Sequence, residues 1–150
     1  MIQKDINQEN QESNAVDALL KTKNTSREDL IIANLLNQGF LRVFNGEYEK
    51  GFNYFRQIQT IKPGNIVAAN NMSTCKIFLN KTNDSIKLLE DLMKKDQLNS
   101  INDQMVLNLV NMYDIHFPNN TAEKRSILAE FCSKYSKDTV NANIYLKQKS

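Results

Sequence analysis

The residues of this chain that could do acid–base or metal chemistry are few and scattered. His116 is the only histidine, and Asp114 lies two positions before it, a spacing that points the two side chains apart on a helix. A zinc site would therefore have to draw most of its ligands from carboxylates, which zinc uses less readily than histidine or cysteine. The carboxylates Glu90, Asp91 and Asp96 fit a solvated helix face. We therefore predict no catalytic residue, no metal site and no cofactor.

Sequence motifs for common enzyme classes are also missing. The chain contains no GxGxxG, GxxxxGK[ST], GxSxG or HExxH segment. Its two cysteines, Cys75 and Cys132, lie far apart without a CxxC motif, and they are expected to be reduced, buried thiols in a reducing compartment. These observations predict a protein that is not an enzyme and has no small-molecule substrate.

The bulk composition is that of one helical domain with little charge bias. The 150 residues are 41% apolar, with only four glycines and two prolines, which suits a helical protein. Nineteen basic and seventeen acidic residues leave a net charge of +2, and no run of Lys or Arg exceeds two residues. A nucleic-acid-binding surface would require a basic patch, so we expect no nucleic-acid partner.

Residues 32–65 and 66–99 are two consecutive copies of one 34-residue pattern. Stepping forward by 34 residues places small residues on small ones and apolar residues on apolar ones. The matching pairs include Gly39–Ser73, Gly46–Asn80, Gly51–Ser85, Phe55–Leu89 and Ile58–Leu92. A 34-residue period with this punctuation is typical of tetratricopeptide (TPR) helix pairs. The alternative is an ordinary amphipathic helix bundle in which the period is a coincidence.

The physics of the repeated positions supports helix pairs. Gly costs roughly 1 kcal/mol relative to Ala inside a helix, so Gly39 and Gly51 suggest a close helix crossing. Gly46 and Asn80 fall where first helices end, and both residue types readily adopt the left-handed cap conformation. Pro63 is expected to end the second helix. Phe55 is expected on the inner face of that helix, packed within its own pair and against the next unit.

The apolar periodicity predicts an all-α, TPR-like solenoid of about three helix pairs with a C-terminal capping helix. The first helix should begin at a Thr25 or Ser26 cap and end near Asn45, with an apolar stripe of Leu30, Ala33, Leu36, Phe40, Leu41 and Phe44. A third unit starts after a slightly longer connection, and Thr121 is expected to cap its second helix. The further helices are expected at about 47–61, 66–80, 83–95, 102–117, 122–136 and 138–147.

The chain divides into a polar leader, residues 1–24, and the helical domain, residues 25–150. The leader holds one apolar cluster, Ala15–Val16 and Ala18–Leu19–Leu20, which either forms a short helix docked on the first repeat or is disordered. It does not resemble a secretory signal or a mitochondrial transit peptide. No stretch approaches the 18 apolar residues of a membrane span, so we expect a cytoplasmic protein without a transmembrane segment.

First helices line the concave face of a TPR stack, which predicts the partner-binding surface. Amide side chains can both donate and accept, so they can pair with the backbone of an extended segment while apolar neighbours hold its side chains. Asn37, Asn71 and Asn108 occupy equivalent positions in three successive helices, and they either bind such a segment or tie neighbouring helices together. The predicted binding residues are Leu36, Asn37, Phe40, Phe44, Asn70, Asn71, Thr74, Phe78, Leu107, Asn108 and Asn111.

One run of residues is more specific than a generic TPR unit. It comprises Asn70–Asn71 and Cys75, then Asp84–Ser85 and Leu89–Glu90, and finally Leu107–Asn108–Leu109 and Met112–Tyr113–Asp114. This run resembles the C-terminal TPR region of subunit 12 of the trafficking protein particle (TRAPP) complex, over roughly residues 30–147. The resemblance implies a non-enzymatic subunit of a tether that acts as an exchange factor for Rab GTPases in ER–Golgi traffic and autophagy. It carries over no catalytic residues.

Two functions from different classes follow. The first is a scaffold subunit that binds other protein subunits of a TRAPP-like vesicle-tethering complex, in the cytoplasm and with a peripheral place at ER–Golgi membranes left open. The second is a TPR adaptor that captures a partner segment in another large assembly, whether ciliary, mitochondrial or chaperone-associated. Residues 102–116 contain no Lys or Arg, which argues against a carboxylate clamp for chaperone tails.

Overall fold

The computed structural model describes residues 27–97 and 101–135, and the regular elements among them are all helices. The first helix covers 27–44 of the described residues. It is followed by α2 (Tyr48–Ile61), α3 (Ile66–Phe78), α4 (Thr82–Lys95), α6 (Asp103–His116) and α7 (Thr121–Tyr135). The expected leader, the Thr25 or Ser26 cap and the capping helix at 138–147 lie outside the described residues. No helix in the described part is both long and apolar enough to cross a membrane.

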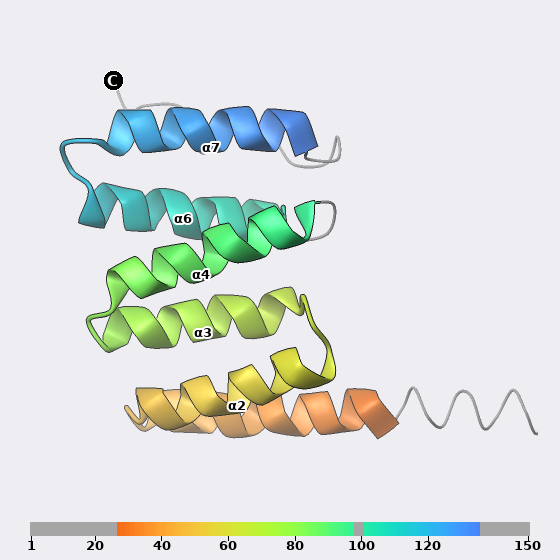
Figure 1. Cartoon of the computed structure of the whole chain (residues 1–150). Helices are drawn as coiled ribbons and strands as arrows, with labels where there is room; N and C mark the ends of the chain where they lie inside the picture. Colours follow the sequence, from red (N-terminus) through yellow and green to blue (C-terminus); the bar gives the residue numbers. More distant parts are fainter. Residues whose placement is uncertain (1–26, 98–100, 136–150) are drawn as a thin grey trace, which may run out of the picture.

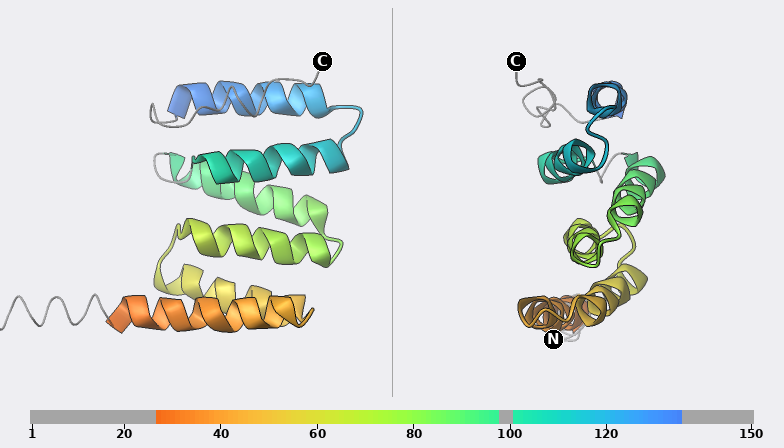
Figure 2. Two further views of the ribbon diagram at one scale, coloured as in Figure 1. Left: turned by 180° about the vertical axis from the view of Figure 1, so that it is seen from behind. Right: turned by 90° about the vertical axis from the view of Figure 1, so that its left-hand side faces the viewer.

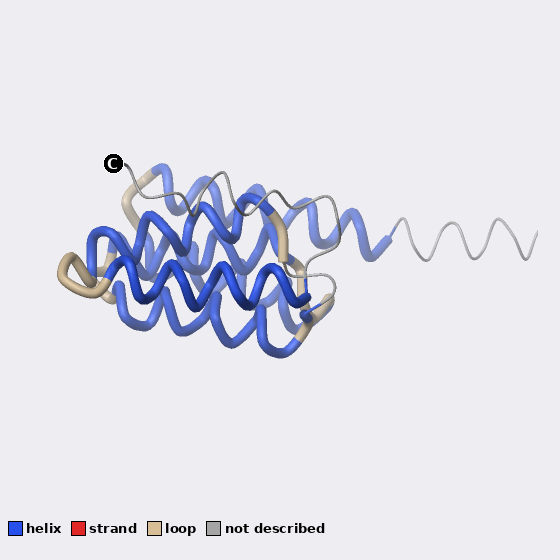
Figure 3. The backbone as a smooth tube through the Cα atoms, turned by 90° about the horizontal axis from the view of Figure 1, so that it is seen from above, coloured by secondary structure: helices blue, strands red, loops and turns tan. Residues whose placement is uncertain are grey.

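The helices stack in sequence order as antiparallel neighbours (Figure 1). Seen from above, their axes are roughly parallel to one another (Figure 3). The right-hand view of Figure 2 shows two layers, with the first helix, α3 and α6 in one layer and α2, α4 and α7 in the other. Each of α2, α3, α4 and α6 packs against the next helix along the chain. The predicted TPR-like solenoid of about three helix pairs is confirmed.

The first helix pair is built around the two predicted crossing glycines. A Cβ atom on Gly39 would lie 2.5 Å from Cε1 of Phe55, so the buried ring occupies the space that a side chain would take. A Cβ atom on Gly51 would lie 2.8 Å from Cγ2 of Val43 and 3.3 Å from the carbonyl oxygen of Gly39. Phe55 and Ile58 are fully buried. The glycines therefore let the helix axes approach and let a phenylalanine fill the crossing.

The second helix pair makes the same crossing with serines. The hydroxyl of Ser85 donates to the carbonyl oxygen of Ser73 over 2.8 Å, and the two Oγ atoms lie 2.6 Å apart. These are the residues that follow Gly51 and Gly39 by one repeat, and both serines are buried. The 34-residue period thus corresponds to an equivalent contact in three dimensions. Buried hydroxyls need partners, and here each serine supplies one to the other.

The helix ends largely match the sequence expectations. Gly46 and Asn80 have φ of +75° and +59°, the left-handed conformation predicted for both, and α2 ends two residues before Pro63. The Thr121 prediction was wrong. Thr121 is the first residue of α7, and its hydroxyl donates to the carbonyl oxygen of Phe117 over 2.7 Å. The preceding helix end therefore uses the hydroxyl that was assigned to capping.

The predicted apolar stripe of the first helix was wrong in most of its members. Leu30, Leu41 and Phe44 are 67%, 50% and 88% exposed. The stripe that packs against α2 lies instead on the side of Gly39, where the ring of Phe55 sits. Besides Gly39 it contains Ile32, Leu35, Leu36 and Val43. The helix carries apolar residues on more than one face, so periodicity alone did not identify the face that packs against α2.

Replacing Phe55 by alanine tests the predicted core position. The ring is fully buried against Gly39 and the residues of α3, so Phe55→Ala should lower the free energy of unfolding by about 3–5 kcal/mol. Urea denaturation followed by circular dichroism measures the loss. A loss below about 1 kcal/mol, less than is usual for a large buried aromatic side chain, would contradict this register.

The contrast between the two crossings yields a compensation test. The first unit combines Gly39 with Phe55, and the second combines Ser73 with the smaller Leu89. Gly39→Ser alone should destabilise by about 1–3 kcal/mol, because the new side chain overlaps the ring. Adding Phe55→Leu removes that overlap, so the loss in the double variant should fall short of the sum of the two single losses by about 0.5–3 kcal/mol.

The matched control is Ala33→Ser, an exposed position of the same helix. Its effect should add to that of Phe55→Leu. Simple additivity for Gly39→Ser as well would show that the two positions are not in contact.

Candidate partner-binding face

The predicted binding residues lie on the first helix, α3 and α6, the three helices of one layer. We call the exposed side of this layer the inner face. It is defined by three equivalent positions in each helix: Asn37, Phe40 and Phe44 of the first helix, Asn71, Thr74 and Phe78 of α3, and Asn108, Asn111 and Ile115 of α6. Five predicted residues are exposed: Asn37, Phe40, Phe44, Phe78 and Asn111. Six are half-buried: Leu36, Asn70, Asn71, Thr74, Leu107 and Asn108.

An exposed apolar row runs across the three helices of the inner face. Phe44, Phe78 and Ile115 occupy equivalent positions near the C-terminal ends of the first helix, α3 and α6, and they are 88%, 55% and 75% exposed. Sequence reasoning missed Ile115. The signal was available, because Asn71 and Asn108 already indicated a step of 37 residues into the third unit, and the same step leads from Phe78 to Ile115.

The aromatic residues of the face differ in how firmly they are held. Phe40 lies edge-on to the buried Phe55, with ring centroids 5.5 Å apart. Phe78 stacks on Tyr48 of α2, with centroids 4.5 Å apart and planes within 5°. Phe44 is the most exposed large apolar side chain among the described residues. Phe40 and Phe78 thus have structural contacts of their own, whereas Phe44 presents nearly its whole ring to solvent.

The asparagines are used unequally. Nδ2 of Asn108 donates to Oδ1 of Asn70 over 3.2 Å, which ties α6 to α3. Asn71 donates instead to the carbonyl oxygen of Val67 in its own helix, over 2.7 Å, and Asn37 is exposed. The inter-helix tie therefore uses Asn70, the neighbour of the residue that the repeat aligned. Asn37 and Asn111 are the amides of the set that lie exposed for a partner.

The ionisable residues near the third unit form structural pairs. The hydroxyl of Tyr113 donates to Oε1 of Glu90 over 2.7 Å. The pKa of Tyr113 is raised well above its ordinary value, mainly because the hydroxyl is buried and secondly because of the neighbouring Glu90 carboxylate. Glu90 is thus half-buried and bonded, so treating it as part of a solvated face was wrong. Nε of Arg125 donates to Oδ1 of Asp114 over 3.0 Å. These contacts join α4 to α6 and α6 to α7.

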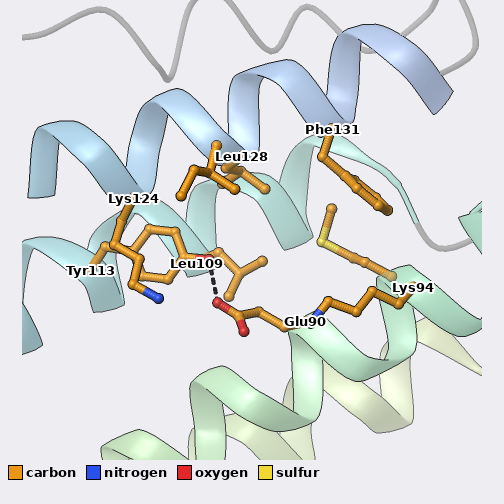
Figure 4. Close-up of a pocket in the computed structure, with 9 residues that line it drawn as sticks. Glu90, Lys94, Leu109, Tyr113, Lys124, Leu128 and Phe131 are labelled. Carbon is orange, nitrogen blue, oxygen red and sulfur yellow. Dashed lines mark hydrogen bonds between the residues drawn. The ribbon is translucent and has the colours of Figure 1, made fainter.

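A pocket between α4, α6 and α7 surrounds the bond between Tyr113 and Glu90 (Figure 4). Leu109 contributes to its apolar lining, and Lys94 and Lys124 contribute its basic groups. The tyrosine hydroxyl in this pocket is not poised as a nucleophile, because it donates to Glu90 and its pKa is raised. Within the described ranges, no three His, Cys, Asp or Glu residues are grouped to hold a metal ion.

Both thiols are buried, as predicted. Cys75 and Cys132 are fully buried and unpaired, and burial raises the pKa of each to about 11. A thiol is nucleophilic as its thiolate, so neither residue is poised to react at neutral pH. Cys75 acts as a core residue, packed between α2 and α3.

Comparison with known proteins supplies the relationship that geometry alone leaves open. No protein-family model matches the chain. Trafficking protein particle complex subunit 12 of mouse is 29% identical over 100 residues, which cover 67% of this chain and 12% of that protein. The human protein of the same name is 27% identical over 100 residues, covering 67% of this chain and 14% of its own length.

The chain is similar to TRAPP subunit 12. The predicted resemblance is thereby confirmed, over a length that corresponds to about one eighth of the curated TRAPP subunits it matches. The similarity does not itself assign binding residues, so the inner face rests on the geometry of the described helices.

Thiol labelling tests the packing of the helix pairs. At pH 8.5 the folded protein should react slowly with a thiol reagent at both cysteines, because burial keeps the thiols protonated and covered. Both should react fully in a denaturing concentration of guanidinium, as counted by absorbance or mass. Rapid reaction of native Cys75 would contradict the close packing of α2 and α3.

Proposed function

We propose that this chain is a non-enzymatic TPR scaffold subunit of a TRAPP-like vesicle-tethering complex that acts in ER–Golgi traffic and autophagy through protein–protein contacts. The observation that carries the proposal is the similarity to TRAPP subunit 12 of mouse and human. The helical stack supports it, because solenoids of this kind present extended binding surfaces. The chain would act in the cytoplasm, at the periphery of ER–Golgi membranes.

The absence of enzymatic activity is supported by how the reactive groups of the described residues are used. Tyr113 and Glu90 bond to each other, and Asp114 binds Arg125. The thiols of Cys75 and Cys132 are buried with raised pKa values. These groups are therefore used in contacts between helices. A scaffold needs such contacts, whereas a catalytic centre needs reactive groups that are accessible to a substrate.

We place the partner on the inner face. Contiguous exposed apolar residues are typical of interaction surfaces, and Phe44, Phe78 and Ile115 repeat at one position in three successive helices. Exposed Asn37 precedes Phe44 by about two helical turns and exposed Asn111 precedes Ile115 by about one, and both amides can pair with a partner backbone. The partner would be another protein subunit, held by apolar contacts and amide hydrogen bonds.

Affinity purification of the tagged full chain tests the proposed assembly. We expect TRAPP core subunits to co-purify, as identified by mass spectrometry. Consistent recovery of a different assembly, without any TRAPP subunit, would contradict the proposal and favour the TPR adaptor.

A double variant of the inner face tests the proposed surface. Phe44→Ser with Ile115→Ser should weaken binding to the recovered subunits at least tenfold, because burying one large apolar side chain contributes about 1.5–3 kcal/mol. The alternative pair, Asn71→Ala with Phe78→Ala, tests the surface less specifically, because Phe78 also packs on Tyr48 and its loss would remove that contact as well. Helical circular dichroism should not change in either case.

The control for this test is Ile127→Ser on α7, which replaces a 58% exposed isoleucine in the other layer. Its affinity should equal that of the unmodified protein. If Ile127→Ser weakens binding and the double variant does not, the partner binds the outer layer instead.

A further inference from the structure

Each junction between consecutive helix pairs repeats one contact. The small residue at the crossing of the second helix meets a residue of the next first helix. A Cβ atom on Gly51 would lie 3.6 Å from Sγ of Cys75, and Oγ of Ser85 lies 3.2 Å from Sδ of Met112. Cys75 and Met112 are equivalent residues of α3 and α6, and they are 0% and 3% exposed. This position is therefore buried wherever a preceding helix pair covers it.

The first helix carries the same position without that cover. The counterpart of Cys75 one repeat earlier is Leu41, which is 50% exposed. Asn34 is exposed as well, although its counterparts Ala68 and Met105 are fully buried. Two positions that α3 and α6 bury at their junctions are thus open on the first helix.

A second exposed leucine lies on the same side of the first helix. Leu30, which is 67% exposed, precedes Asn34 by four residues and Leu41 by eleven, which is close to three helical turns. We call the stripe of Leu30, Asn34 and Leu41 the open edge. It lies on the opposite side of the helix from Gly39, where Phe55 packs, and it adjoins the inner face without including Phe44.

Residues 15–19 repeat the local pattern of the second helices. Those helices read small–apolar–x–x–apolar at their crossings, as in Gly51–Phe52–x–x–Phe55 and Ser85–Ile86–x–x–Leu89, and the leader reads Ala15–Val16–x–x–Leu19. The distance along the chain also fits. Ala15 precedes Gly39 by 24 residues, between the 22 from Gly51 to Ser73 and the 25 from Ser85 to Val110.

We propose that the segment around Ala15, Val16 and Leu19 packs against the open edge, in the place that a second helix takes at the other two junctions. Ala15 would contact Leu41 as Gly51 contacts Cys75. A segment that precedes the first helix by only 8 to 12 residues acts at an effective concentration in the millimolar range, which favours it over a second copy or a separate protein. This contact goes beyond the proposed scaffold role and would leave Phe44 exposed, as its counterparts Phe78 and Ile115 are beside their covered junctions.

The open edge differs from the other two junctions in one polar residue. The amide of Asn34 replaces a buried Ala68 or Met105, and a covered amide requires hydrogen-bond partners. The leader carries polar side chains on both sides of Ala15, at Asn14 and Asp17, and either can supply such a partner. The polar residue is therefore compatible with a covering segment of this composition.

Two adjacent leucines provide a matched test in the full chain. Leu19 aligns with the buried Leu89, whereas Leu20 aligns with Glu90 and with the exposed Arg56, positions that take charged residues. Leu19→Asp should lower the melting temperature by about 5 °C, and Leu20→Asp by less than about 2 °C. Combining Leu19→Asp with Leu41→Asp should lower it little more than the larger single effect, because both remove one contact.

A disulfide supplies a second readout that does not depend on stability. In the otherwise unmodified chain, Ala15→Cys with Leu41→Cys should form an intrachain disulfide on mild oxidation, while Ala18→Cys with Leu41→Cys should not. The native thiols are buried and should not compete. Equal melting temperatures for Leu19→Asp and Leu20→Asp, or crosslinks only between two molecules, would overturn the proposal. The second result would assign the open edge to self-association.

Discussion

In the first two units, the structure depends on close contact between the paired helices, which small residues allow. Where Gly51 meets the backbone of Gly39, the helices of the first unit touch almost directly; where Ser85 meets Ser73, a hydrogen bond joins the two helices. Larger side chains at these positions would push the helices apart and change the angle at which the next unit stacks. Because every unit packs on its neighbour, that change would propagate along the solenoid.

The tight crossing also determines which surfaces remain for binding. Packing uses one side of each first helix for its partner and, in α3 and α6, the opposite side for the preceding unit. The exposed side that remains carries Phe44, Phe78 and Ile115 as a repeating apolar row. Small residues at the crossings thus leave an extended surface on the stack, and the proposed scaffold role requires such a surface.

Sequence analysis predicted the fold well, and only some of the residues that it predicted for binding are exposed. Some features follow from local constraints that require a particular type of residue at one position. They are the period of 34 residues, the left-handed caps at Gly46 and Asn80, and the burial of Phe55. Choosing the packed face of the first helix required tertiary information, because that helix has apolar residues on several sides. The amide contacts were harder still, since Asn70 and Asn71 are adjacent and chemically identical, and only the relative placement of α3 and α6 decides that Asn70 bonds to Asn108.

The central claim is that the exposed apolar row of the inner face meets another subunit. Photo-crosslinking tests it most directly, with p-benzoylphenylalanine placed at position 44 in one preparation and at position 127 of the outer layer in another. We predict that the probe at 44 crosslinks to a TRAPP core subunit and that the probe at 127 gives no such product. Crosslinks to a TRAPP subunit from 127 alone would contradict the placement, and crosslinks from 44 only to unrelated proteins would contradict the assembly.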